Sequence, residues 1–111
     1  MGAQQTWAWL VGIVLLLIAI LGFVMEPPLL GFFDVNGSHN VVHLITGLLF
    51  IWAAWKGPTK PYNQWLGVIY IVVGIVGFFG VINDLLAINT ADNWLHIVIG
   101  VISALVGWMA K

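Results

Sequence analysis

The chain has 111 residues, of which 62% are hydrophobic and 6% are charged, and its formal net charge is −1. A soluble domain carries roughly 25% charged residues, so this composition excludes a water-exposed globular surface and predicts an integral membrane protein in contact with the lipid bilayer. Three lysines and no arginine exclude nucleic-acid binding, which needs a dense basic surface. The absence of cysteine excludes disulfides and thiolate metal sites.

The first apolar segment runs from Trp7 to Met25 and is followed by Glu26-Pro27-Pro28. Its 19 residues are close to the roughly 20 that cross a bilayer core. The prolines that follow cannot continue a helix. This segment is therefore predicted to be a retained membrane-spanning helix.

Three shorter apolar segments follow, and clusters of glycine, proline and asparagine separate them. They are Val41–Trp55, Trp65–Ile82 and Trp94–Met109. Backbone groups in lipid must pair within their own segment, so each segment is expected to be a helix. We predict one all-α integral membrane domain over residues 1–111, with four transmembrane helices at about residues 7–25, 39–56, 63–82 and 92–110 packed as a four-helix bundle.

The few charged residues predict how this bundle is oriented. All acidic residues flank the first and third loops, namely Glu26, Asp34, Asp84 and Asp92. All lysines lie in the second loop or at the C-terminus, namely Lys56, Lys60 and Lys111. The positive-inside rule then places the N-terminus, the C-terminus and the second loop in the cytoplasm. The expected location is a multi-pass position in a cytoplasmic membrane.

The second half of the chain repeats polar and glycine positions of the first half. At a spacing of 53 residues the matched pairs are Asn36/Asn89, Asn40/Asn93, His43/His96, Gly47/Gly100 and Trp55/Trp108. At a spacing of 55 residues, Gly12 and Gly22 match Gly67 and Gly77. Because both hairpins begin on the same side of the membrane, the pattern predicts two tandem hairpins related as a parallel repeat.

Polar residues and glycines form one stripe on the second helix and again on the fourth. Asn40 and His43 lie three residues apart, and Gly47 follows one turn later; the second copy of the stripe is Asn93, His96 and Gly100. Small residues on one face let helices approach closely. We therefore predict that these two helices face the interior and that their polar ends form an inter-helix network of Asn40, His43, Asn93 and His96.

Several chemical roles are open for these histidines. In a structural role they hydrogen-bond across helices. In a metal-binding role His39, His43, His96 and Asp92 supply four ligands, for which zinc is the best match. In a haem-binding role His43 and His96 are the two axial ligands. Proton or ion handling is a fourth role, although the only polar residues deeper in the core are Thr46, Tyr70 and Ser103.

The sequence contains no paired acid and base, no nucleophile with its base and no phosphate-binding loop, so we do not expect an enzyme. The expected function is that of a structural or accessory membrane subunit, either as a small homo-oligomer or beside other membrane subunits, with no cofactor. The alternative is a metal- or haem-binding membrane protein that uses His43 and His96 between the second and fourth helices.

Two spaced patterns carry a family resemblance. The first has glycine, asparagine and histidine at fixed spacing from Gly31 to Gly47, and the second runs from Asp92 to Gly100. Together they resemble a family of small prokaryotic four-helix membrane proteins classed as a domain of unknown function. The resemblance implies a four-helix protein of a bacterial or archaeal cytoplasmic membrane, and it implies no reaction.

Overall fold

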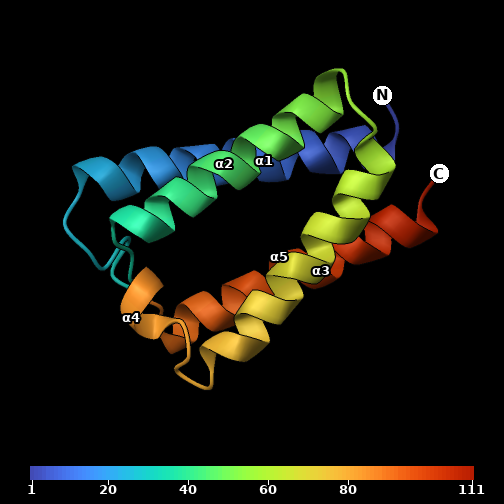
Figure 1. Cartoon of the computed structure of the whole chain (residues 1–111). Coiled ribbons are helices and arrows are strands. Elements are labelled where there is room, and N and C mark those ends of the chain that lie inside the picture. The colour runs from blue at the N-terminus through green and yellow to red at the C-terminus, as the bar shows by residue number, and fades with distance from the viewer.

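The computed structural model describes all 111 residues and contains helices but no strands. The helices are α1 (Ala3–Val24), α2 (Gly37–Trp55), α3 (Thr59–Gly77), the one-turn α4 (Asn83–Leu86) and α5 (Thr90–Met109) (Figure 1). The predicted all-α class is confirmed.

Helix boundaries fall where the sequence places proline, glycine and capping asparagine. The α1 helix ends before Pro27-Pro28, because proline lacks the N–H that a helix requires and restricts the residue before it. The Asn36 side chain starts α2 by accepting a hydrogen bond from the His39 amide at 2.9 Å. Pro61 is tolerated in the first turn of α3, where amide groups need no partner within the helix.

The segment after Pro58 differs from its predicted bounds. Helix α3 covers residues 59–77, whereas 63–82 was predicted. It ends early because Gly80 adopts a φ of +75°, which a right-handed helix does not contain. The separate helix α4 then forms and stops at Ala87, whose φ is +50°. The sequence does not indicate this turn, because the apolar segment Trp65–Ile82 continues through it.

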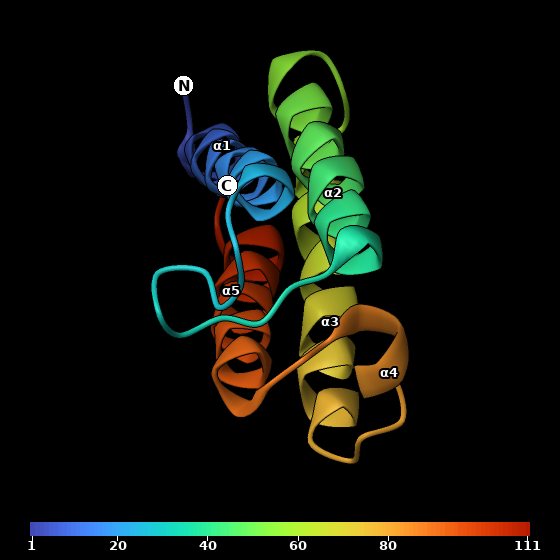
Figure 2. The same ribbon diagram turned by 90° about the vertical axis from the view of Figure 1, so that its left-hand side faces the viewer.

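The helices form two antiparallel hairpins that lie side by side. Helices α1 and α2 make the first hairpin, and α3 and α5 make the second (Figures 1 and 2). Both termini lie at the same end of the molecule, and α4 lies at the opposite end beside α2. The core where the long helices meet consists of Ala8, Val11, Leu15, Phe50, Ala54, Leu66 and Tyr70.

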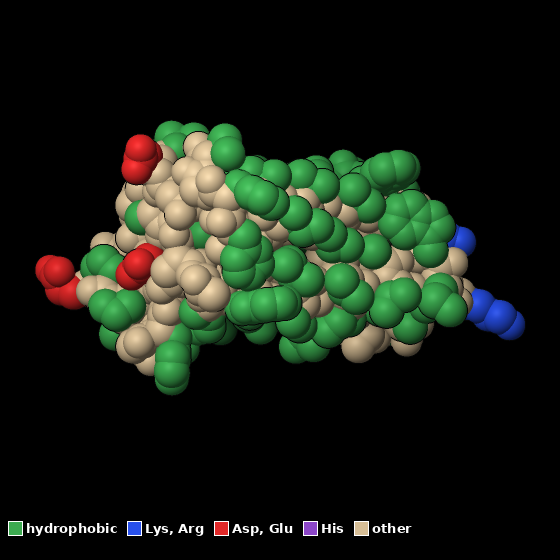
Figure 3. All heavy atoms as spheres, turned by 90° about the horizontal axis from the view of Figure 1, so that it is seen from below, with side chains coloured by type: hydrophobic (Ala, Val, Ile, Leu, Met, Phe, Trp, Pro, Cys, Tyr) green, Lys and Arg blue, Asp and Glu red, His purple; other side chains and the backbone are tan.

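Three helices, α1, α2 and α5, are long and apolar enough to cross a membrane. At 1.5 Å per residue, the 22 residues of α1 extend about 33 Å, which matches a hydrocarbon core of about 30 Å. The α3 helix is as long as α2, at 19 residues, but polar side chains lie in its first two turns. An apolar surface covers the middle of the molecule, with acidic side chains at one end and lysines at the other (Figure 3).

Glycines bring the two helices of each hairpin into backbone contact. A Cβ atom added at Gly12 of α1 would lie 3.0 Å from the Gly47 carbonyl oxygen of α2. One added at Gly67 of α3 would lie 2.8 Å from the Gly100 carbonyl oxygen of α5. Such close approach is typical of helices packed through small residues in membranes. The two contacts occupy matching positions in the two hairpins.

Two hydrogen bonds join the hairpins at the acidic end. The Asn36 side-chain amide donates to the Leu85 carbonyl at 3.0 Å, and the Asn89 side-chain amide donates to the Phe32 carbonyl at 2.8 Å. Asn89 follows Asn36 by 53 residues, and Leu85 follows Phe32 by the same 53. The segment before α2 and the segment before α5 are therefore joined by two hydrogen bonds between equivalent residues.

Candidate functional site: a buried cluster of three histidines

Three histidines meet between the two hairpins near the acidic end. His39 and His43 come from α2, and His96 comes from α5; each is at most 3% exposed. The ring centroids lie 4.3 Å apart for His39 and His43, 5.5 Å for His39 and His96, and 5.9 Å for His43 and His96. One ring nitrogen from each histidine lies within 4.8 Å of the other two. The side chains of α2 and α5 thus bring three imidazoles together, although these two helices are not a closely packed pair.

Most of the ring nitrogens in this cluster have no hydrogen-bond partner in the protein. This holds for both nitrogens of His43 and Nδ1 of His96. The His39 nitrogens make no hydrogen bond of good geometry, although backbone groups of Leu86 and Asp34 lie close to that ring. A buried polar group without a partner costs about 1–3 kcal/mol, and native proteins contain few of them. The cluster therefore does not show the hydrogen bonds that a purely structural role for the histidines predicts.

His39 and Asp92 occupy equivalent positions in their helices, but their side chains make different contacts. Each is the third residue of its helix, and each amide donates to the capping asparagine, Asn36 or Asn89. The Asp92 carboxylate also accepts a hydrogen bond from the Asn89 amide at 3.0 Å, which completes a capping box. Asp92 lies outside the three-histidine cluster. Its predicted role as a fourth metal ligand stays a prediction.

The two asparagines of the predicted polar network pack within their own hairpins. The Asn40 side chain lies against Gly22 of α1, and the Asn93 side chain lies against Gly77 of α3. The Oδ1 atoms of both asparagines are buried and accept no hydrogen bond. Any added Cβ at either glycine would collide with the asparagine, so glycine at these positions makes room for the polar side chain one turn from the cluster.

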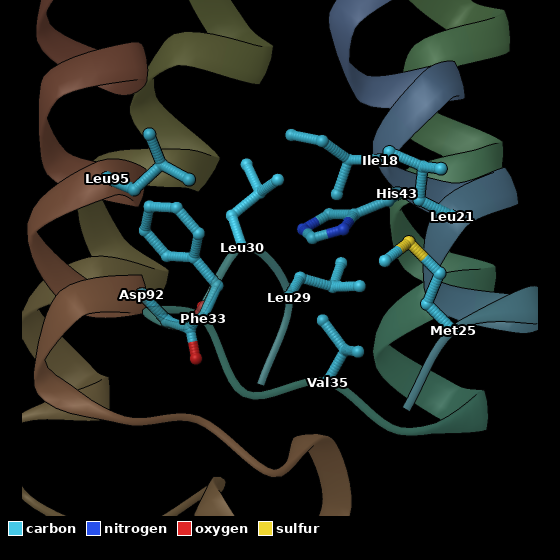
Figure 4. A pocket seen from close by; sticks show the side chains of 10 residues that line it. All are labelled: Ile18, Leu21, Met25, Leu29, Leu30, Phe33, Val35, His43, Asp92 and Leu95. Atoms are coloured by element: carbon cyan, nitrogen blue, oxygen red, sulfur yellow. The ribbon is translucent and has the colours of Figure 1, made fainter. Parts of the chain in front are cut away.

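A small cavity lies on one side of the cluster, beneath the loop that joins α1 to α2. It measures about 40 Å³ and is lined mainly by apolar residues, with His43 and Asp92 as its polar members. The His43 ring points into it from the first hairpin, and Asp92 lies across it on the second hairpin (Figure 4). The loop residues Leu29 and Val35 are 4% and 5% exposed, so the loop packs into the gap between the hairpins.

A second cavity lies on the other side of the cluster, between α2 and α3. It measures about 160 Å³ and includes all three histidines in its lining. The Tyr70 ring meets the His96 ring edge-on at 5.6 Å, and the Tyr70 hydroxyl lies 2.7 Å from the Thr46 hydroxyl. The Thr46 hydroxyl also lies 2.8 Å from the Val42 carbonyl, and either hydroxyl of the Thr46–Tyr70 pair can donate to the other. The sequence shows both residues as core polar groups but does not indicate this pairing.

Comparison with known proteins assigns the chain to a family. A family model described as a domain of unknown function (DUF4383) matches residues 5–109. The chain belongs to the DUF4383 family. The resemblance to a family of unknown function is thereby confirmed. No curated protein and no solved structure matches the chain.

Proposed function

We propose that the protein is a metal-binding membrane protein, and that His39, His43 and His96 hold one divalent ion, with zinc as the best match. The observation that carries the proposal is the burial of three imidazoles whose nitrogens lie within 4.8 Å of one another and largely lack partners. Imidazole nitrogen is a preferred ligand of zinc, copper, nickel and iron. Three histidines with one open position form a known type of zinc site.

The distances in the cluster are close to those that a metal ion requires. With zinc–nitrogen bonds of about 2.0–2.1 Å, two ligand nitrogens of a tetrahedral site lie roughly 3.4 Å apart. The nitrogens here must therefore approach by no more than about 1.4 Å from their widest separation of 4.8 Å. We expect rotations of the imidazole rings, rather than a change in the helices, to supply this movement.

The alternatives explain the cluster less well. In a structural role, the ring nitrogens would form hydrogen bonds, and both nitrogens of His43 and Nδ1 of His96 form none. In a haem site, His43 and His96 would lie on opposite faces of a porphyrin, but His39 packs 4.3 Å and 5.5 Å from those two rings. The cluster has space for an ion rather than for a flat macrocycle.

For the membrane arrangement we propose four spans in a prokaryotic cytoplasmic membrane, with both termini and the α2–α3 loop in the cytoplasm. The pairing of α3 with α5 along the second hairpin supports the fourth span. The matching glycine contacts and the reciprocal asparagine bonds support two repeated hairpins. A cysteine at Asp34 should react with an impermeant reagent from outside the cell, and a cysteine at Lys60 should not; the reverse pattern would overturn the orientation.

The metal site is tested on the purified protein in detergent. The protein is stripped with a chelator, reloaded with zinc and analysed for bound metal per chain. Near-stoichiometric zinc is expected in the parent protein, and loss of zinc is expected in His39→Gln, His43→Gln and His96→Gln. The control Tyr70→Phe keeps the ring against His96 and should retain zinc.

Gel filtration shows whether each variant remains folded. If the parent protein takes up no zinc, copper, nickel or iron, or if folded histidine variants retain it, the proposal is wrong. The histidines would then serve the bundle itself, and a structural or accessory role would become the better explanation.

A further inference from the structure

The larger cavity is in contact with the proposed metal site. Its inner part is formed by His39, His43 and His96. These three residues would supply three ligands to a four-coordinate ion and leave its fourth position open. In metal enzymes such an open position takes water or an exogenous ligand. This inference rests on the proposed metal site and concerns what occupies that position.

The outer part of the cavity is apolar, and in the proposed four-span arrangement it lies within the membrane. It is formed by Val42 of α2, Ile69 and Val73 of α3, and Leu86 of α4. Val42 is 39% exposed and Ile69 is 51% exposed. Ile69 lies near the middle of α3. In that arrangement the exposed edge of the cavity faces lipid rather than water.

The size and lining of the cavity restrict what it can accept. A cavity of about 150 Å³ in an apolar core admits a benzene molecule, and the cavity here measures about 160 Å³. An ion passing between Val42 and Ile69 would lose its hydration without gaining a charged partner, which is expensive in hydrocarbon. A neutral molecule of single-ring size meets no such barrier.

We propose that this cavity admits a small, neutral, lipid-soluble molecule from the bilayer, and that a lone pair on that molecule occupies the open position of the metal ion. Val42, Ile69 and Val73 contact the apolar body of the ligand. The Thr46–Tyr70 hydroxyl pair lies on the same wall and holds the Tyr70 ring against His96.

The test uses the full chain loaded with cobalt(II), because zinc has no visible spectrum. Bound cobalt is quantified first, and 4-methylpyridine is then added at mildly alkaline pH, where it is neutral. The matched comparison is isonicotinate, which has the same ring nitrogen but a carboxylate in place of the methyl group. A saturable change in the cobalt spectrum is expected with 4-methylpyridine, with at least tenfold weaker binding of isonicotinate.

Two variants locate the binding site. Ile69→Trp fills the lipid-facing edge of the cavity and should retain cobalt while weakening 4-methylpyridine at least tenfold. Ile75→Trp changes an exposed residue of the same helix that lines no cavity and should leave binding unchanged.

The outcomes separate the two proposals. If cobalt does not bind, the metal site itself fails, and this inference fails with it. If cobalt binds but its spectrum ignores 4-methylpyridine, or if isonicotinate binds equally well, the metal site stands and the lipid-soluble ligand is wrong. Equal affinities in Ile69→Trp and Ile75→Trp would also overturn it, because binding would not depend on the cavity.

Discussion

Gly100 tests whether the close approach of α3 and α5 determines both stability and the position of His96. In Gly100→Ala, the new Cβ atom would lie 2.6 Å from the Ile71 amide nitrogen and 2.7 Å from the Gly67 carbonyl oxygen. Both are backbone atoms, which cannot rotate out of the way. Since ordinary contacts begin at about 3.4 Å, the two helices must separate by about 0.8 Å.

This separation has two measurable consequences. Overpacking of this kind typically lowers the free energy of unfolding by about 1–3 kcal/mol. His96 lies one helical turn before Gly100, so it shifts relative to His39 and His43. Changes to residues that support metal ligands weaken affinity by about 10–100-fold, and a zinc affinity at least about tenfold lower is expected here.

The matched control is Gly37→Ala at the first residue of α2, where an added Cβ meets nothing within 4 Å. It should be neutral or stabilise the protein by up to about 1 kcal/mol, because alanine has less backbone freedom than glycine in the unfolded chain. Denaturant unfolding followed by tryptophan fluorescence measures stability, and calorimetric titration measures zinc binding. If Gly100→Ala matches the parent protein in both, the close approach of these helices supports neither property.

Three further predictions concern other parts of the molecule. Gln4→Ala should destabilise the protein by about 1–3 kcal/mol in the same unfolding assay, because it removes the 2.7 Å bond to the Val106 carbonyl and the 2.8 Å bond from the buried Asn63 side-chain amide, which keeps only the Gln4 backbone carbonyl as acceptor; an unchanged midpoint would refute this. Asn89→Ala removes the α5 cap and should lower the free energy of unfolding by about 1 kcal/mol. Asn89→Asp keeps the capping oxygen and loses only the bond to Phe32, so it should lower that free energy less. Equal losses in the two variants would contradict the assignment of Asn89 as the cap. Zinc affinity should fall as the pH is lowered, because protons compete with the metal for imidazole nitrogens; calorimetry at several pH values checks the sign, and a pH-independent affinity would argue against histidine ligation.

The sequence allowed the helical class, the separation of charge and the meeting of the polar ends of α2 and α5 to be predicted, but not whether His43 and His96 touch. These features depend on hydrophobic patterning, on loop charges and on residues at helical spacing, all of which act locally or through the bilayer. Spacing also grouped His39 with His43, because residues four apart share a helix face. The three imidazoles could therefore be named as candidate ligands, but their contact depends on the rotation of α2 and α5, which the sequence does not contain.

Other features depend on contacts that local patterns do not contain. The sequence does not show that Asn40 packs on Gly22 of α1, because that requires the rotation of both helices. Asp92 has helical spacing to His96 but is engaged in a cap, since its carboxylate reaches the Asn89 amide. The folding of Leu29 and Val35 into the gap between the hairpins depends on tertiary packing, so the first loop could be predicted as a loop but not as part of the core.

The reciprocal bonds of Asn36 and Asn89 have a consequence for how the site can vary. In a symmetric dimer of identical hairpins, every substitution would occur twice, and a histidine at the third position of one helix would face a second copy of itself. A single chain that carries both hairpins is free of this constraint. One copy of that position is His39, whose ring lies in the histidine cluster. The other is Asp92, whose carboxylate takes part in the cap of α5. Joining the halves covalently thus permits an odd number of imidazoles and an asymmetric environment around them.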